Sequence, residues 1–168
     1  MRTESTNRLL LTITSCTLVF AACHDTPSQP TDTPPFQARI NSQPFVADIT
    51  DFSISNAGSR LVITGVRTTP GGGGRQVSVQ LENWNGPGTY QLGDPAGGAL
   101  GFILDRDATQ MVGSWLTTSQ ATGQLTVSSV DQTGRRVVGT FSFEARDSLG
   151  NALTVSEGSF AGHYFVDP

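Results

Sequence analysis

The side chains that most often carry catalysis are scarce in this sequence of 168 residues. It has two histidines, His24 and His163, and two cysteines, Cys16 and Cys23. His24 stands in a proline-rich stretch, and His163 falls on the polar side of an alternating segment, where we expect it to be exposed. The sequence has no G-x-S-x-G motif, which would present a nucleophilic serine to a histidine. We therefore expect a protein without enzymatic activity.

Oxygen ligands for a metal ion could come from Asp105 and Asp107, with Asp94 nearby. The intervening Arg106 and the lack of a D-x-D-x-D-G series favour a solvated turn instead. Histidines and cysteines are not grouped at the spacing of a zinc or iron site. We expect no metal site and no cofactor.

The aromatic residues offer a candidate binding surface. Trp84 stands between Asn83 and Asn85 in a polar segment without a strand pattern. An exposed indole can stack on a sugar ring while flanking amides bond its hydroxyls, so these three residues, with Tyr90 and Trp115, are candidate ligand contacts. A structural role is the alternative. Trp84 would then cap one end of the fold, while Tyr90 and Trp115 alternate as core residues do.

The charge distribution argues against a nucleic-acid partner. The formal net charge is -4, and all ten basic residues are arginines. Apart from the pair Arg135-Arg136, acids and arginines are scattered. Binding to a phosphate backbone requires a basic face, which this pattern does not provide.

The N-terminal segment has the features of a signal peptide. Arg2 and Arg8 precede fourteen uncharged residues, Leu9 to Ala22. A membrane-spanning helix needs about 17–25 apolar residues, whereas the hydrophobic region of a signal peptide has roughly 7–15. We expect residues 1–22 to be removed from the mature protein.

The end of this segment, Phe20-Ala21-Ala22-Cys23, resembles the bacterial lipobox, with Phe20 in place of the usual Leu, Val or Ile. The resemblance implies a diacylglyceryl group on the Cys23 thiol and cleavage just before it. Ile13-Thr14-Ser15-Cys16 also fits the pattern but leaves a hydrophobic region of about seven residues. Secretion without a lipid is also compatible with this segment, as is a buried N-terminal strand or helix.

Residues 23–35 read as a lipidated cysteine followed by a tether. The stretch contains four prolines and no large apolar residue, so it cannot bury enough surface to fold and should be disordered. A cysteine-free domain, residues 36–168, follows. We expect an anchor in the bacterial cell envelope, with the outer membrane favoured and the domain facing the periplasm or the outside. Asp25 does not decide between inner and outer membrane.

The domain shows the alternation of β-strands. Val77, Val79 and Leu81 share one face, and the run from Val137 to Ala145 alternates over nine residues. Such runs, separated by Gly, Pro, Asn and Asp, predict an all-β, antiparallel β-sandwich or flattened barrel of about nine or ten strands. The four glycines Gly71–Gly74 precede a β-run rather than a helix, so they predict a hairpin loop and not a phosphate site.

Three short motifs, taken in order, carry a family resemblance. They are Ala38-Arg39-Ile40-Asn41 with Phe45 and Ala47, Gly88-Thr89-Tyr90-Gln91-Leu92, and Gly139-Thr140-Phe141-Ser142-Phe143 with Gly158-Ser159-Phe160. The pattern resembles a domain-of-unknown-function family of small bacterial lipoproteins, common in Bacteroidota. The resemblance implies a β-sandwich lipoprotein without an assigned activity and with no catalytic residues.

Together these features favour an envelope-anchored, non-enzymatic binding module whose partner is a glycan or an envelope protein. The alternative is an accessory or scaffold subunit of an envelope protein assembly. A hydrolase is the third hypothesis.

Overall fold

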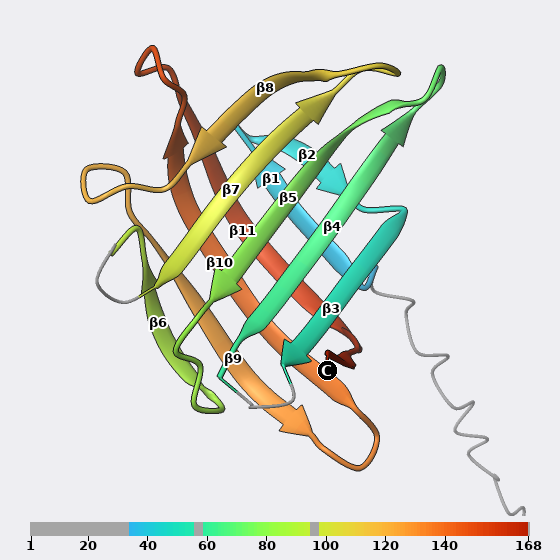
Figure 1. Cartoon of the computed structure of the whole chain (residues 1–168), viewed down its shortest axis with the longest axis vertical. Helices are drawn as coiled ribbons and strands as arrows, with labels where there is room; N and C mark the ends of the chain where they lie inside the picture. The colour runs from blue at the N-terminus through green and yellow to red at the C-terminus, as the bar shows by residue number, and fades with distance from the viewer. Residues whose placement is uncertain (1–33, 56–58, 95–97, 168) are drawn as a thin grey trace, which may run out of the picture. The chain divides into compact units, whose positions relative to one another are not determined.

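Figure 1 shows a computed structural model of the chain, which describes residues 34–55, 59–94 and 98–167. The chain divides into two compact units, Met1–Thr31 and Asp32–Pro168. The expected signal peptide and the lipidation site Cys23 lie outside the described residues. All described core residues belong to the second unit. Within the described ranges, no helix has the length and apolar character needed to cross a membrane.

The described residues form twelve β-strands and no helix. The strands are β1 (Phe36–Ile40), β2 (Gln43–Val46), β3 (Ile49–Ser55), β4 (Leu61–Thr69), β5 (Gly73–Leu81), β6 (Gly88–Leu92), β7 (Ala99–Arg106), β8 (Met111–Leu116), β9 (Gly123–Asp131), β10 (Arg136–Arg146), β11 (Ala152–His163) and β12 (Phe165–Asp167). The all-β fold class is thus confirmed.

One sheet contains all the strands, in the order β12-β3-β4-β5-β7-β8-β10-β11-β1-β2, with β9 paired to β10 and β6 paired to β9. Figure 1 shows this sheet folded over into two layers, with β3, β4, β5, β7 and β8 in front of β1, β9, β10 and β11. At the β8–β10 junction the layers share one residue pair, Leu116 with Arg146. The ends of the order, β12 and β2, are not paired with each other. The domain is therefore sandwich-like, and the sheet is not closed on itself.

Two features differ from the sequence prediction. The described residues form twelve strands rather than nine or ten, because β8 and the three-residue β12 have no clear apolar alternation. The sheet is also mixed, since β12 runs parallel to β3 and pairs Phe165 with Ser53. The other strand pairs are antiparallel.

A bulge in β11 explains why this strand reads in the sequence as two runs. Val155 and Phe160 both face the core, although strict alternation would put them on opposite faces. The register against β10 shifts between Phe141 and Phe143, and Glu157 has a φ of 51° at this point. One extra residue in the bulged strand restores the inward direction.

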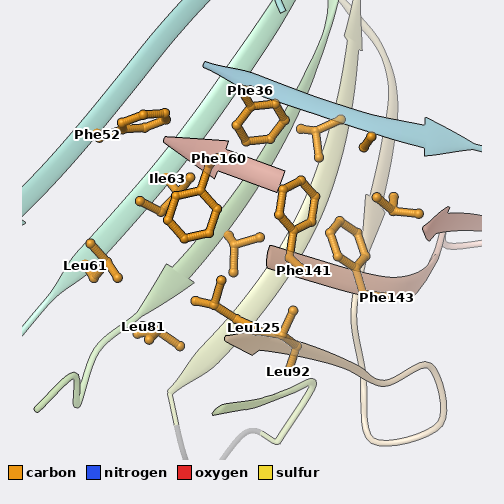
Figure 2. Close-up of a cluster of buried hydrophobic side chains, with 14 of the residues drawn as sticks. Phe36, Phe52, Leu61, Ile63, Leu81, Leu92, Leu125, Phe141, Phe143 and Phe160 are labelled. Carbon is orange, nitrogen blue, oxygen red and sulfur yellow. The ribbon is translucent and has the colours of Figure 1, made fainter. Parts of the chain in front are cut away.

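The core lies between the two layers and is rich in phenylalanine (Figure 2). The ring centroids of Phe36 and Phe141 are 5.1 Å apart, and those of Phe52 and Phe160 are 6.1 Å apart. Several of these rings lie directly over a glycine of a facing or neighbouring strand. The pairs are Phe36 with Gly65, Phe52 with Gly162, Phe141 with Gly158, Phe143 with Gly101 and Phe160 with Gly139. The missing Cβ atoms make room for the rings, so the strand glycines are part of the packing.

The glycine run Gly71–Gly74 forms the predicted hairpin. Strands β4 and β5 pair up to Thr69 and Gly73, and the turn between them has φ angles of 101° at Gly71 and 91° at Gly72. Such left-handed angles favour glycine, which accounts for the composition of this turn.

Candidate functional site: the Trp84 cleft

A cleft of about 440 Å³ lies beside the loop that connects β5 to β6. Its lining comes from four separate segments: Ile54 and Ser55 of β3, Trp84, Asn85 and Gly86 of the loop, Val130 and Gln132 at the end of β9, and Tyr164 and Val166 at the C-terminus. This volume is in the range of sites that take small ligands. The lining residues that the structure describes are uncharged, and they offer apolar contact and neutral hydrogen-bonding groups.

Trp84 is half-buried rather than fully exposed, and it packs against the hydrophobic core as well as lining the cleft. Its backbone N–H donates to the carbonyl oxygen of Ser59 at 2.8 Å, which ties the loop to the chain just before β4. The indole Nε1 is covered and has no hydrogen-bond partner among the described residues. The side chain of Trp84 is held by its packing against the core.

Tyr90 acts as a clamp on the loop. Its hydroxyl lies 2.7 Å from both Asn85 Oδ1 and the Gly86 carbonyl oxygen, either of which can accept its proton. It also accepts a long bond of 3.4 Å from the Asn85 backbone N–H. Tyr90 is held in turn by β6, where it pairs with Leu125 of β9. The hydroxyl of Tyr90 therefore ties Asn85 and Gly86 of the cleft wall to β6.

The family comparison identifies the domain. A family described as "Domain of unknown function (DUF6252)" matches residues 32–162. The chain belongs to this family. The predicted membership in a domain-of-unknown-function family is thus confirmed. The searches matched no curated protein and no solved structure. The match to the DUF6252 family ends at Gly162, so Tyr164 and Val166 of the cleft lie beyond the matched residues.

The structure separates the five predicted ligand residues of the DUF6252 domain. Trp84 and Asn85 line the cleft, and Tyr90 supports it from behind. Asn83 is exposed in the same loop but is not a lining residue. Trp115 lies on β8 opposite Ile103, against the core and over Gly113.

Trp115 is therefore remote from the cleft. Leu81, the last residue of β5, pairs with Ala99, four positions before Ile103 along β7. At about 3.3 Å per residue, roughly 13 Å of strand separates the pairing position of Trp115 from the end of β5 that leads to Trp84.

Sequence reasoning missed most of the described cleft lining, namely Ile54, Ser55, Gly86, Val130, Gln132, Tyr164 and Val166. The parallel pairing of β12 with β3 brings the C-terminus to this site. A three-residue strand has no periodicity that a sequence pattern could detect.

The described histidine, aspartate and glutamate side chains are not among the lining residues of the cleft. His163 is exposed, and its Nδ1 is 3.0 Å from the Gly134 carbonyl oxygen. In the described ranges, no three His, Cys, Asp or Glu residues gather in a way that could hold a metal ion. Asp105 binds Arg75, whereas Asp107 accepts hydrogen bonds from Thr109 and Gln110 in an exposed turn. The backbone hydrogen bonds from these two residues lower the pKa of Asp107.

Proposed function

We propose that this protein is an envelope-anchored lipoprotein whose DUF6252 domain binds a neutral glycan in the Trp84 cleft without chemical turnover. The observation that carries the proposal is the composition of the cleft. It combines two aromatic residues, Trp84 and Tyr164, with the hydroxyl of Ser55 and the side-chain amides of Asn85 and Gln132.

A sugar suits this lining for physical reasons. A pyranose presents a C–H face that packs on an aromatic ring, and a rim of hydroxyls that exchange hydrogen bonds with amides and hydroxyls. The uncharged character of the described lining favours a neutral sugar. The Tyr90 clamp reduces the conformational entropy that the loop would lose on binding.

The proposal of a binding module rather than an enzyme rests on the same lining. General acid–base catalysis needs a titratable group within about 3 Å of the reacting atoms. Among the described residues that line the cleft there is no His, Cys, Asp or Glu. Apart from the phenol of Tyr164, a hydrolase would therefore have to bring its acid and base from outside the described lining.

The two tryptophans allow a direct test by fluorescence. The chain has two Trp residues, so Trp115→Phe leaves Trp84 as the sole indole, and Trp84→Phe leaves Trp115. Neutral oligosaccharides selected on a glycan array should change the emission of the Trp115→Phe variant saturably. The matched Trp84→Phe variant should show no change and weaker binding by calorimetry. Equal responses from both variants, or no binding to any array glycan, would refute the proposal.

The anchor is proposed at Cys23, on the lipobox-like Phe20-Ala21-Ala22-Cys23. Two or three acyl chains on one residue hold a protein stably at a membrane. As an extended polyproline-like spacer, the twelve residues 24–35 would span about 37 Å at 3.1 Å per residue. Mass spectrometry of the mature N-terminus should find a diacylglyceryl-modified Cys23. An unmodified Cys23, or acylation at Cys16, would contradict this assignment.

A second candidate function is that of an accessory subunit of an envelope protein assembly. The outer face of β7 favours it, because Leu100, Phe102 and Leu104 are half-buried there while the smaller Ala99 and Gly101 face the core. On the neighbouring β8, Val112 and Leu116 are 58% and 43% exposed. Apolar side chains gathered on one face mark interaction surfaces.

The two candidates differ in a co-purification experiment. An accessory subunit should retain envelope proteins after gentle detergent extraction, lose them in Leu116→Ser, and bind no glycan. A glycan-binding module should bind its ligand equally well with and without that substitution.

A further inference from the structure

A second pocket, of about 470 Å³, lies at the end of the sandwich where the β1–β2 and β4–β5 hairpins meet. Both hairpins are in the upper part of Figure 1. Its polar lining includes Asn41, Gln43, Arg67 and Arg75, and the pocket shares no lining residue with the Trp84 cleft. Two guanidinium groups in one pocket are notable in a chain whose net charge is -4.

Arg75 is held in a fixed orientation. Its Nε and Nη2 donate to the two carboxylate oxygens of Asp105 at 2.6 and 2.5 Å, a bidentate pair on adjacent strands. Two of its five N–H groups are used in this pair, so both hydrogens of Nη1 and one of Nη2 remain. The hydrogen bond to Asp105 also raises the pKa of Arg75, which therefore stays charged.

Arg67 is held without a partner of opposite charge. Its guanidinium carbon lies 5.4 Å from the centroid of the Phe45 ring, and its Nη1 donates to the Pro44 carbonyl oxygen at 3.0 Å. It has no ion pair with any described residue. The nearby Asp48 accepts its hydrogen bonds from Thr68 instead. Four N–H groups of Arg67 are left to bind a ligand.

The charges at the pocket favour a ligand with a single negative charge. The lining carries the positive charges of Arg67 and Arg75. Asp105 lies outside the lining and pairs with Arg75, so the charge of Arg67 is the one without an ion-pair partner among the described residues. A guanidinium edge matches the two oxygens of a carboxylate, and such charge-assisted bonds are about twice as strong as neutral ones. The amides of Asn41 and Gln43 add neutral donors and acceptors beside it.

We propose that the Arg67–Arg75 pocket is a binding site for the carboxylate of a small hydroxylated acid, such as a sugar acid. The site is independent of the Trp84 cleft and of the proposal made for it. The pocket volume admits a molecule of this size, and preorganised guanidinium groups lower the entropic cost of binding.

The test is a titration of the ¹⁵N-labelled full chain, followed at the arginine Nε–H signals. Sodium glucuronate should shift the signals of Arg67 and Arg75 saturably, and glucose at equal ionic strength should not. Inorganic phosphate should bind no more tightly than glucuronate. Equal shifts with glucose, or no shift at all, would overturn the proposal, and tighter binding of phosphate would overturn the choice of a carboxylate.

Matched variants locate the effect. Arg67→Gln should weaken glucuronate binding at least tenfold, because an ionic hydrogen-bonding group is lost. Arg106→Gln makes the same change of charge at an exposed residue outside the pocket lining and should leave the affinity within twofold. Similar losses of glucuronate affinity in both variants would show that binding depends only on the net charge of the protein, and would refute the proposed site. Trp84→Phe should keep glucuronate binding, so that failure of the glycan proposal and failure of this one can be distinguished.

Discussion

Replacement of Gly139 by alanine tests the role of the strand glycines in the core. Gly139 lies in β10 and pairs with Val127 of β9 and Phe160 of β11. A Cβ atom added there would overlap the carbonyl oxygen of Thr126 and the ring of Phe160, whose Cε1 would be 2.8 Å away. The ring could shift only into a filled core, and the carbonyl belongs to a strand paired on both sides.

The magnitude follows from this geometry. Overpacking of a core typically costs about 1–3 kcal/mol, and a clash with immobile backbone belongs at the upper end. We expect Gly139→Ala to lower the free energy of unfolding by about 3 kcal/mol. An unfolding entropy of about 2 cal/mol/K per residue gives roughly 0.27 kcal/mol/K for a domain of this size. The melting temperature should therefore fall by about 10 °C.

The assay is chemical denaturation of the Asp32–Pro168 domain, followed by tryptophan fluorescence and circular dichroism. Gly88→Ala is the matched control, because its Cβ would lie 3.7 Å from the nearest atom, in Tyr90, at ordinary contact distance. That variant should stay within about 0.5 kcal/mol of the wild type. Adding Phe160→Leu to Gly139→Ala should not restore stability, since the clash with the carbonyl remains. A loss below about 1 kcal/mol in Gly139→Ala would refute the reasoning.

Two further predictions concern the loop clamp and an acidic turn. Tyr90→Phe removes the hydroxyl that binds Asn85 and Gly86. It should lower the free energy of unfolding in urea by about 1 kcal/mol and lower the affinity for any ligand of the Trp84 cleft. Unchanged stability and affinity would show that the hydroxyl does not hold the loop. Hydrogen bonds from Thr68 lower the pKa of Asp48 from its ordinary value of 3.8. The ionised carboxylate therefore stabilises the fold above about pH 4, and this stabilisation is lost as the pH falls through the lower pKa of the folded state. The difference in stability between wild type and Asp48→Ala should accordingly be constant near neutral pH and shrink below about pH 4. A difference that does not depend on pH would contradict this assignment.

Much of the fold could be read from local patterns. Alternation from Val137 to Ala145 correctly placed Phe141 and Phe143 inward, because successive side chains of a strand point to opposite faces wherever it lies. The glycine run at Gly71–Gly74 correctly predicted a hairpin, since its left-handed φ angles depend on a few adjacent residues.

Alternation could not tell which face of β7 is inside. Leu100, Phe102 and Leu104 are the larger apolar set, yet Ala99, Gly101 and Ile103 face the core. The register against β5 decides this, because Gly101 pairs with the buried Val79 and its missing side chain leaves room for the ring of Phe143. That information lies in residues more than 20 positions away.

The candidate site, like the fold, could be predicted from the sequence only in part. The sequence alone singled out Trp84 and Asn85, because their residue types in a polar segment suit ligand contact. It also placed Cys23 at the end of a short apolar run. Only the tertiary structure decided that Trp84 is half-buried, that Trp115 lies elsewhere, and that Tyr164 and Val166 complete the cleft. The physical reason is that a cleft is made by strand pairings between distant segments, here β3 with β12, and a three-residue strand has no local pattern that specifies its partner.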